Sequence, residues 1–176
     1  MIAATRKALA EVAEAQALKP FHGDIEGSGT NIAPLIAYFP KWNVKAADDM
    51  WCAAFVYYCC RLAGFDIPYS PDECVSCSLA GCGGWDEFAR GDKRIEYHKE
   101  SREFSPLPGD IVIFDNVFSN KEHDHIGIVL KAADTQIITA EGNINNRSEI
   151  MTRRRDRHIR AYLRLPDGYS YRSPLV

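Results

Sequence analysis

The chain of 176 residues is long enough for one domain with a full hydrophobic core and short for two. Its net charge of −3 provides no general attraction to nucleic acid or to anionic membranes. No stretch approaches the roughly 20 apolar residues that a membrane span requires. We therefore expect neither a nucleic-acid-binding protein nor a membrane-spanning one.

The first twenty residues lack the continuous apolar core of a secretory signal, because charged residues interrupt them: Arg6, Lys7, Glu11 and Glu14. We expect that the protein stays in the cytoplasm until it is released, or that a leader is missing from the sequence. Within this segment, Thr5–Leu18 places its leucine, valine and alanine residues on one face, which predicts an amphipathic helix packed on the domain.

The next segment, Gly23–Asn31, is a glycine-rich polar loop whose spacing fits neither a dinucleotide fingerprint nor a phosphate-binding loop. A short helix is predicted for Ala33–Phe39, since Pro40 would end it. Acidic residues in this part of the chain could gather around calcium, but they lack the alternating spacing of a calcium loop. We interpret them as solvated loop carboxylates: Asp24, Glu26, Asp48 and Asp49.

The stretch Asp48–Gly64 predicts one buried helix, because nearly every residue between its ends is apolar. Asp49 is the predicted N-cap. Cys52 then lies in the first turn, where the helix dipole stabilises a thiolate and lowers the pKa of the cysteine. A lone cysteine on an apolar helix often serves only packing, so a catalytic role for Cys52 depends on partners elsewhere in the chain.

Five further cysteines follow: Cys59, Cys60, Cys74, Cys77 and Cys82. The spacing of the last three is similar to that of a zinc knuckle, with a fourth ligand from the far end of the cysteine helix. A second pair with matching spacing is absent, and two other interpretations are open: reduced buried thiols, and a disulfide among these residues. The irregular stretch at about residues 65–108 is interpreted as a cysteine-rich insertion flanking a site, with one short helix around Trp85–Ala89.

After Pro108-Gly109-Asp110, a strong turn, the sequence changes to the period of strands. Short connections between five apolar runs predict an antiparallel meander: Ile111–Phe114, His125–Leu130, Gln136–Glu141, Glu149–Arg153 and Ile159–Leu165. The cationic run Arg153-Arg154-Arg155 is interpreted as a solvated strand or turn. Helices first and strands later predict an α+β domain, with the cysteine helix buried against a roughly five-stranded sheet.

A cysteine nucleophile needs a base, and the base needs a third group that fixes its tautomer. His125 stands where a loop enters a predicted strand, and Glu141 and Asn143 stand at the end of the next one. If these strands are antiparallel neighbours, His125 and Glu141 meet. Two other interpretations remain open: His123 and His125 as half of a metal site, and Glu141-Gly142-Asn143 as an ordinary turn.

Four motifs in this order resemble the CHAP amidase family, a group of NlpC-type, papain-like peptidases: Trp51–Val56, Pro108–Phe114, Asp124–Val129 and Glu141–Asn143. The resemblance runs from about Asn31 to Leu165, and the whole chain, residues 1–176, is interpreted as one such domain. By position, Cys52 matches the family nucleophile and His125 the base. Glu141 matches the residue that orients the histidine, and Asn143 an additional polar residue of the site.

The resemblance implies a papain-like fold and hydrolysis of an amide bond in bacterial peptidoglycan without a cofactor. The enzyme would be an N-acetylmuramoyl-L-alanine amidase or an endopeptidase. It would be made in the bacterial cytoplasm, of a host or of a phage or mobile element, and act at the cell wall after release or secretion. Two alternatives stay open: a zinc-holding module that binds a partner without hydrolysis, and a papain-like hydrolase of a substrate outside the wall.

Overall fold

The computed structural model describes residues 4–172, which form an α+β domain with five helices and a six-stranded antiparallel sheet. The helices are α1 (Arg6–Ala17), α2 (Ala33–Ile36), α3 (Val44–Ala47), α4 (Cys52–Leu62) and α5 (Cys82–Gly91). The strands are β1 (Glu96–His98), β2 (Ile111–Phe114), β3 (His125–Ala132), β4 (Gln136–Ile144), β5 (Arg147–Arg154) and β6 (Ile159–Arg164).

The strand order is β1-β6-β2-β3-β4-β5, and every neighbouring pair is antiparallel. The predicted five strands are confirmed, but the expected simple meander holds only from β2 to β5, because β6 returns to pair with β2. The prediction of about five strands was one short. The missed strand, β1, has only three residues and gains its pairing from β6 at the far end of the chain.

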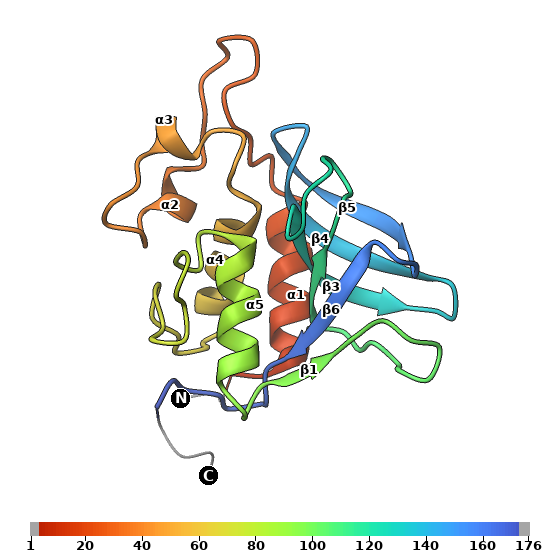
Figure 1. Cartoon of the computed structure of the whole chain (residues 1–176). Helices are drawn as coiled ribbons and strands as arrows, with labels where there is room; N and C mark the ends of the chain where they lie inside the picture. Colours follow the sequence, from red (N-terminus) through yellow and green to blue (C-terminus); the bar gives the residue numbers. More distant parts are fainter. Residues whose placement is uncertain (1–3, 173–176) are drawn as a thin grey trace.

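The helices lie on one side of the sheet, and Figure 1 shows α1 next to the strands, with α2 and α3 farther from them. Helix α4 packs on α1 and on strands β3 and β4, so it lies in the middle of the core. Seven of its first eight residues have less than a tenth of their surface exposed. As the sequence predicted, this helix has no broad face for water, which fixes its position against the sheet.

Helix α4 begins later than the sequence predicted. The expected N-cap, Asp49, has a left-handed backbone (φ 60°), and the helix starts at Cys52 after Trp51, which makes no side-chain cap. The reason is a long-range contact. The amide side chain of Asn146, from the turn after β4, accepts hydrogen bonds from the backbone N–H of Asp49 and from the indole of Trp51. The turn before the helix is therefore fixed from outside the helix.

The stretch from 65 to 108 is more regular than its composition suggested. It contains the ten-residue helix α5, of which only the part around Trp85–Ala89 was predicted, and strand β1. Helix α5 contacts both α4 and β1. Its buried aromatic residues, Trp85 and Phe88, join the same core as α4, so this stretch is packed into the domain beside the cysteine helix.

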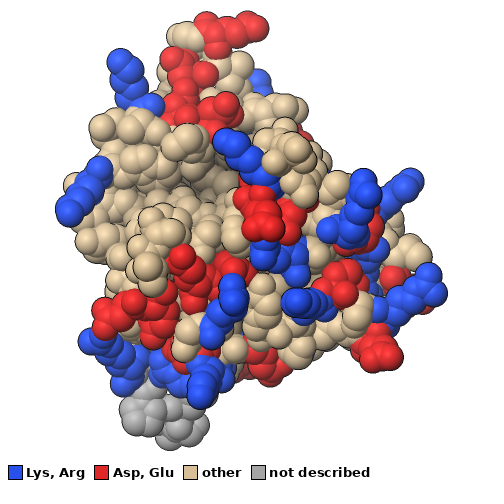
Figure 2. All heavy atoms as spheres, in the orientation of Figure 1, with Lys and Arg blue, Asp and Glu red and all other residues tan. Residues whose placement is uncertain are grey.

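The surface carries charges of both signs close together, as Figure 2 shows for one face of the molecule. On that face, uncharged residues gather over the side of α2 and α4, and charged ones lie along the sheet and the lower edge. None of the helices within residues 4–172 is long and apolar enough to span a lipid bilayer.

Candidate active site

Cys52 is the first residue of α4 and is 8% exposed. Its sulfur lies 3.7 Å from the sulfur of Cys82, and interactions with His125 and with the backbone N–H of Ala53 help to lower the pKa of the thiol. Backbone donors and the positive end of the helix dipole both favour a thiolate at this position. The predicted place of Cys52 at the beginning of a buried helix is confirmed.

His125 and Glu141 meet as the antiparallel pairing of β3 and β4 predicted. Nε2 of His125 lies 2.6 Å from Oε2 of Glu141, and both side chains are almost completely buried. With Nε2 occupied by the carboxylate, Nδ1 is the ring atom left to bond the sulfur of Cys52. The glycine at position 127 leaves room for the side chain of Glu141, because a Cβ there would lie 2.8 Å from Cγ of Glu141. The carboxylate thus fixes which ring nitrogen faces the thiol.

Glu141 is held by more than the histidine. Arg153 donates two hydrogen bonds to its carboxylate, Nε to Oε1 at 2.9 Å and Nη2 to Oε2 at 2.6 Å, and the hydroxyl of Thr139 donates to Oε1 at 2.6 Å. Burial raises the pKa of Glu141, but the bonds from Arg153 and His125 outweigh it and lower that pKa to about 2. Glu141 is therefore an anion at all ordinary pH values.

The prediction that the run Arg153-Arg154-Arg155 is solvated was wrong for two of its members. Arg153 pairs with Glu141, and Arg155 pairs with Glu100 at 2.8 Å, its side chain only 7% exposed. Only Arg154 is exposed. The sequence offered a signal for this, since neighbouring residues on a strand point to opposite faces of the sheet. Arg153 and Arg155 therefore share one face, and Arg154 lies on the other.

The thiol and imidazole favour their charged forms together. The hydrogen bond with Cys82 is the largest influence on the pKa of Cys52; burial opposes it, and His125 adds to it, so the pKa falls to about 5. Burial lowers the pKa of His125, but its bonds to Cys52 and Glu141 raise it to about 9. Each charge stabilises the other. The arrangement can hold a thiolate beside an imidazolium near neutral pH.

Helix α4 and strand β4 come into close contact at Gly142. A Cβ on this residue would lie 2.6 Å from Cβ of Phe55 and 2.9 Å from the ring of Trp51. Gly142 sits where the pairing of β4 with β5 shifts register, between Glu141 and Ile144, and such bulges often re-aim side chains next to active sites. The absence of a side chain here lets the helix that carries Cys52 approach the strand that carries Glu141.

Asn143 is not joined to the histidine by any hydrogen bond in the structure. It has a left-handed backbone (φ 64°), and its Oδ1 is buried without a hydrogen-bond partner among the described residues. Its predicted role as an additional polar residue of the site stays a prediction. His123 lies elsewhere, with Nε2 at 3.3 Å from the buried carboxylate of Asp86, so it does not form a metal site with His125.

The cysteines whose spacing is similar to that of a zinc knuckle do not form a metal site among the described residues. Cys59 and Cys60 are fully buried towards the far end of α4, Cys74 donates to the carbonyl oxygen of Gly84, and Cys77 is exposed. Within residues 4–172 no group of three or more histidine, cysteine or acidic side chains could hold a metal ion. Cys82 instead contacts Cys52, with 3.7 Å between the two sulfurs. The acidic residues before α4 form no such group either, and Asp48 bonds Asn146.

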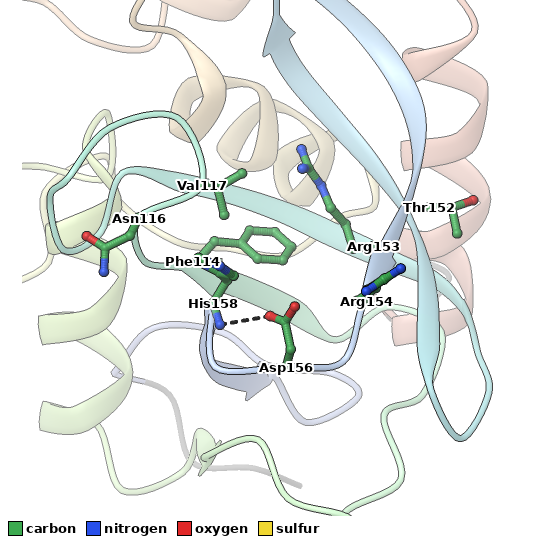
Figure 3. A pocket seen from close by; sticks show the side chains of 8 residues that line it. All are labelled: Phe114, Asn116, Val117, Thr152, Arg153, Arg154, Asp156 and His158. Carbon is green, nitrogen blue, oxygen red and sulfur yellow. Dashed lines mark hydrogen bonds between the residues drawn. The ribbon is translucent and has the colours of Figure 1, made fainter.

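A pocket of about 240 Å³ lies beside strands β2 and β5, and Figure 3 shows the side chains that line it. Phe114 and Arg153 belong both to its wall and to the support of the site: Phe114 stacks on His125 at 5.9 Å, and Arg153 bonds Glu141. Arg153 and Arg154 point in different directions there. The pocket therefore shares two residues with the surroundings of His125 and Glu141, but neither of these nor Cys52 lines it.

Helices packed on one face of an antiparallel sheet, with a cysteine at the start of the buried helix facing a histidine and a carboxylate, define the papain-like class of hydrolase folds. A family model described as "CHAP domain" matches residues 43–143, and the chain belongs to this family. The family consists of amidase- and peptidase-type hydrolases, generally related to the cell wall. No curated protein matches the sequence significantly.

Proposed function

We propose that the protein is a peptidoglycan hydrolase that cleaves an amide bond of the bacterial cell wall with Cys52 as nucleophile. The observation that carries this proposal is the buried chain of contacts from Cys52 through His125 to Glu141, in a CHAP-domain chain. A thiol beside an imidazole that is fixed by a carboxylate is the arrangement that amide hydrolysis through an acyl-enzyme uses.

In the proposed reaction, the thiolate of Cys52 attacks the carbonyl carbon of the amide. The backbone N–H groups at the beginning of α4 point towards the charge that develops on the carbonyl oxygen, as expected for a helix N-terminus. His125 gives its proton to the departing amine, and the acyl group stays on the sulfur. The neutral histidine then takes a proton from water, and the resulting hydroxide releases the acid.

Glu141 and Arg153 act through the histidine in this mechanism. The anion of Glu141 stabilises the imidazolium and fixes the ring, while Arg153 keeps the glutamate ionised and in place. No step needs a cofactor. The bond that is cut is either the N-acetylmuramoyl-L-alanine amide or one within the stem peptide or cross-bridge.

The test is incubation of purified peptidoglycan with wild type and with Cys52→Ala. New amino termini are labelled with dinitrofluorobenzene and identified by mass spectrometry. A new L-alanine terminus identifies an amidase, and any other residue identifies an endopeptidase. Cys59→Ala is the matched control, because this cysteine lies on the same helix and is completely buried away from the site.

We expect the new amines with wild type and Cys59→Ala and none above background with Cys52→Ala. Digestion by Cys52→Ala at the wild-type rate would remove the mechanism. Rapid alkylation of Cys52 by iodoacetamide, without any release of amines from peptidoglycan, would leave a reactive thiol whose substrate lies outside the wall.

A further inference from the structure

A second thiol lies directly against the proposed nucleophile. The sulfurs of Cys52 and Cys82 are 3.7 Å apart, and each cysteine is the first residue of its helix, α4 and α5 respectively. Their exposed fractions are 8% and 7%. A small molecule that reaches one sulfur therefore meets the other.

We propose that Cys82 is the resolving thiol of the site: when a peroxide oxidises Cys52, Cys82 closes a Cys52–Cys82 disulfide that blocks the enzyme reversibly. The inference requires that Cys52 is a reactive thiolate, as in the proposed function. It does not depend on which bond, or which substrate, the enzyme cleaves.

The chemistry takes place in two steps. The thiolate of Cys52 attacks one oxygen of hydrogen peroxide and breaks the O–O bond; the sulfur loses two electrons and becomes a sulfenic acid, and hydroxide leaves. The sulfur of Cys82 then attacks the sulfur of the sulfenic acid. A disulfide bond forms, the S–OH bond breaks, and the hydroxyl leaves as water with the proton of the Cys82 thiol.

The geometry permits this closure. A disulfide bond is about 2.05 Å long, so the sulfurs have to approach each other by about 1.7 Å from their present 3.7 Å. Both cysteines stand at the first positions of their helices, directly after the N-cap residues Trp51 and Gly81. Rotation about the two Cα–Cβ bonds, with a small shift of these helix ends, is the movement that closure requires.

The protonation of Cys82 suits the second step. Its bond with Cys52 is the largest influence that raises the pKa of the Cys82 thiol, and burial raises it further, so beside the thiolate it remains a neutral donor. Oxidation of Cys52 to a neutral sulfenic acid removes the neighbouring negative charge. The N-terminus of α5 then favours a thiolate on Cys82.

No other cysteine has the same opportunity. Cys59 and Cys60 are completely buried, and burial raises their pKa values strongly. Cys74 is bonded to the carbonyl oxygen of Gly84. Cys77 is exposed and lies next to the segment that leads to Cys82, since its sulfur is 2.8 Å from where a Cβ of Gly81 would be. Unlike Cys82, Cys77 has no sulfur–sulfur contact with Cys52 among the described residues.

The test is treatment of the whole purified protein with hydrogen peroxide, then alkylation of free thiols and digestion with chymotrypsin, which cuts after aromatic residues and leucine. The sequence separates the two cysteines from the other four: Cys52 lies in the peptide 52–55 and Cys82 in the peptide 80–85. We expect a cross-linked pair of these peptides that has lost two hydrogen atoms and that dithiothreitol separates.

Two variants sharpen the test. With Cys82→Ala we expect Cys52 to gain two oxygen atoms as a sulfinic acid, and after dithiothreitol its reaction with iodoacetamide should stay below about one-tenth of the untreated rate. After dithiothreitol, wild type and the control Cys77→Ser should again react with iodoacetamide at the untreated rate, to within about twofold. The readouts are mass and thiol reactivity, so the result stands even if peptidoglycan is not the substrate.

A sulfenic acid on Cys52 that dimedone traps in wild type, with no cross-link to the peptide 80–85, would overturn the proposal. Recovery of Cys82→Ala equal to that of wild type would overturn it as well. A cross-link between any other pair of cysteines would give the resolving role to a different thiol.

Discussion

On the sheet side of the site, Glu141 accepts hydrogen bonds from His125, Thr139 and Arg153, and all of these bonds are between 2.6 and 2.9 Å. On the helix side, the sulfur of Cys52 lies 3.7 Å from the sulfur of Cys82 and also interacts with His125, and its helix is positioned by packing and by the neutral bonds of Asn146. The base is thus held by charge-assisted bonds and the nucleophile mostly by its surroundings.

This difference indicates how much each side of the site can move. Charge-assisted hydrogen bonds are roughly twice as strong as neutral ones, so the imidazole has little freedom. The sulfur can rotate towards either the histidine or Cys82. A nucleophile that has to move onto a substrate benefits from such freedom, whereas a base has to stay oriented.

The largest expected effect comes from removing the base. We expect His125→Ala to lower kcat/KM on peptidoglycan by roughly 10³- to 10⁴-fold, because the thiolate loses its counter-ion and the leaving amine its proton donor. His123→Ala is the control, since that ring contacts Asp86 rather than Cys52, and we expect its loss to stay within about threefold. Equal losses in the two variants, measured by amine release, would mean that the wrong histidine was assigned.

The sheet side was also the more predictable half. His125 stands at the start of β3 and Glu141 near the end of β4, the next strand, and the pairing of these neighbours brings the two residues together without knowledge of the rest of the fold. The order of β2 to β5 and the position of Cys52 on a buried helix followed from local patterns in the same way. Strand β1 could not be predicted, because three residues show no period and its partner β6 is distant in sequence.

The helix side depends on contacts that local patterns do not contain. The spacing of Cys82 to Cys74 and Cys77 is similar to that of a zinc knuckle, but the packing of α5 on α4 places Cys82 against Cys52 instead. Asn146 fixes the turn before Cys52 from nearly a hundred residues away. Arg153 was hidden in a run of three arginines, and only the face of β5 on which it lies distinguishes it from Arg154.

The second prediction concerns a substitution that separates helix α4 from strand β4. We expect Gly142→Ala to lower kcat/KM by about 10²-fold, because a methyl group there pushes α4 away from β4 and a shift of about 1 Å at reacting atoms has this effect. Overpacking should also reduce the free energy of unfolding by about 1–3 kcal/mol, measured by urea denaturation. The control is Gly83→Ala, because the nearest atoms to a Cβ at this position are 3.8 Å away. Gly168 is less suitable, since its φ of 75° would strain an alanine.

The pH dependence tests whether the two sides of the site act as one ion pair. The pKa of Cys52 is lowered to about 5 and that of His125 raised to about 9, so thiolate and imidazolium coexist between these values. We expect kcat/KM to fall about tenfold per pH unit below the lower limit, where the thiolate is protonated, and above the upper one, where the imidazolium loses its proton. Both apparent values belong to the coupled pair. A profile without either limb would contradict the pair.

The smallest effect should come from Arg153→Met, which tests whether the sheet side is held by more bonds than it needs. His125 and Thr139 still bond Glu141, so we expect kcat/KM to fall only about fivefold, less than for loss of a group that reacts. The buried carboxylate loses its counter-ion, which should cost about 3–5 kcal/mol of the free energy of unfolding at pH 7. The lowered pKa of Glu141 stabilises the folded state at pH values above 4.5, the ordinary pKa of a glutamate, and this contribution is lost as the pH falls to about 2. The difference in unfolding free energy between wild type and variant should therefore narrow between pH 4.5 and pH 2. Arg154→Met, on the exposed face of the same strand, should change neither quantity. A loss with Arg153→Met as large as that with His125→Ala would mean that the glutamate depends on the arginine alone, and that the sheet side is no better secured than the helix side.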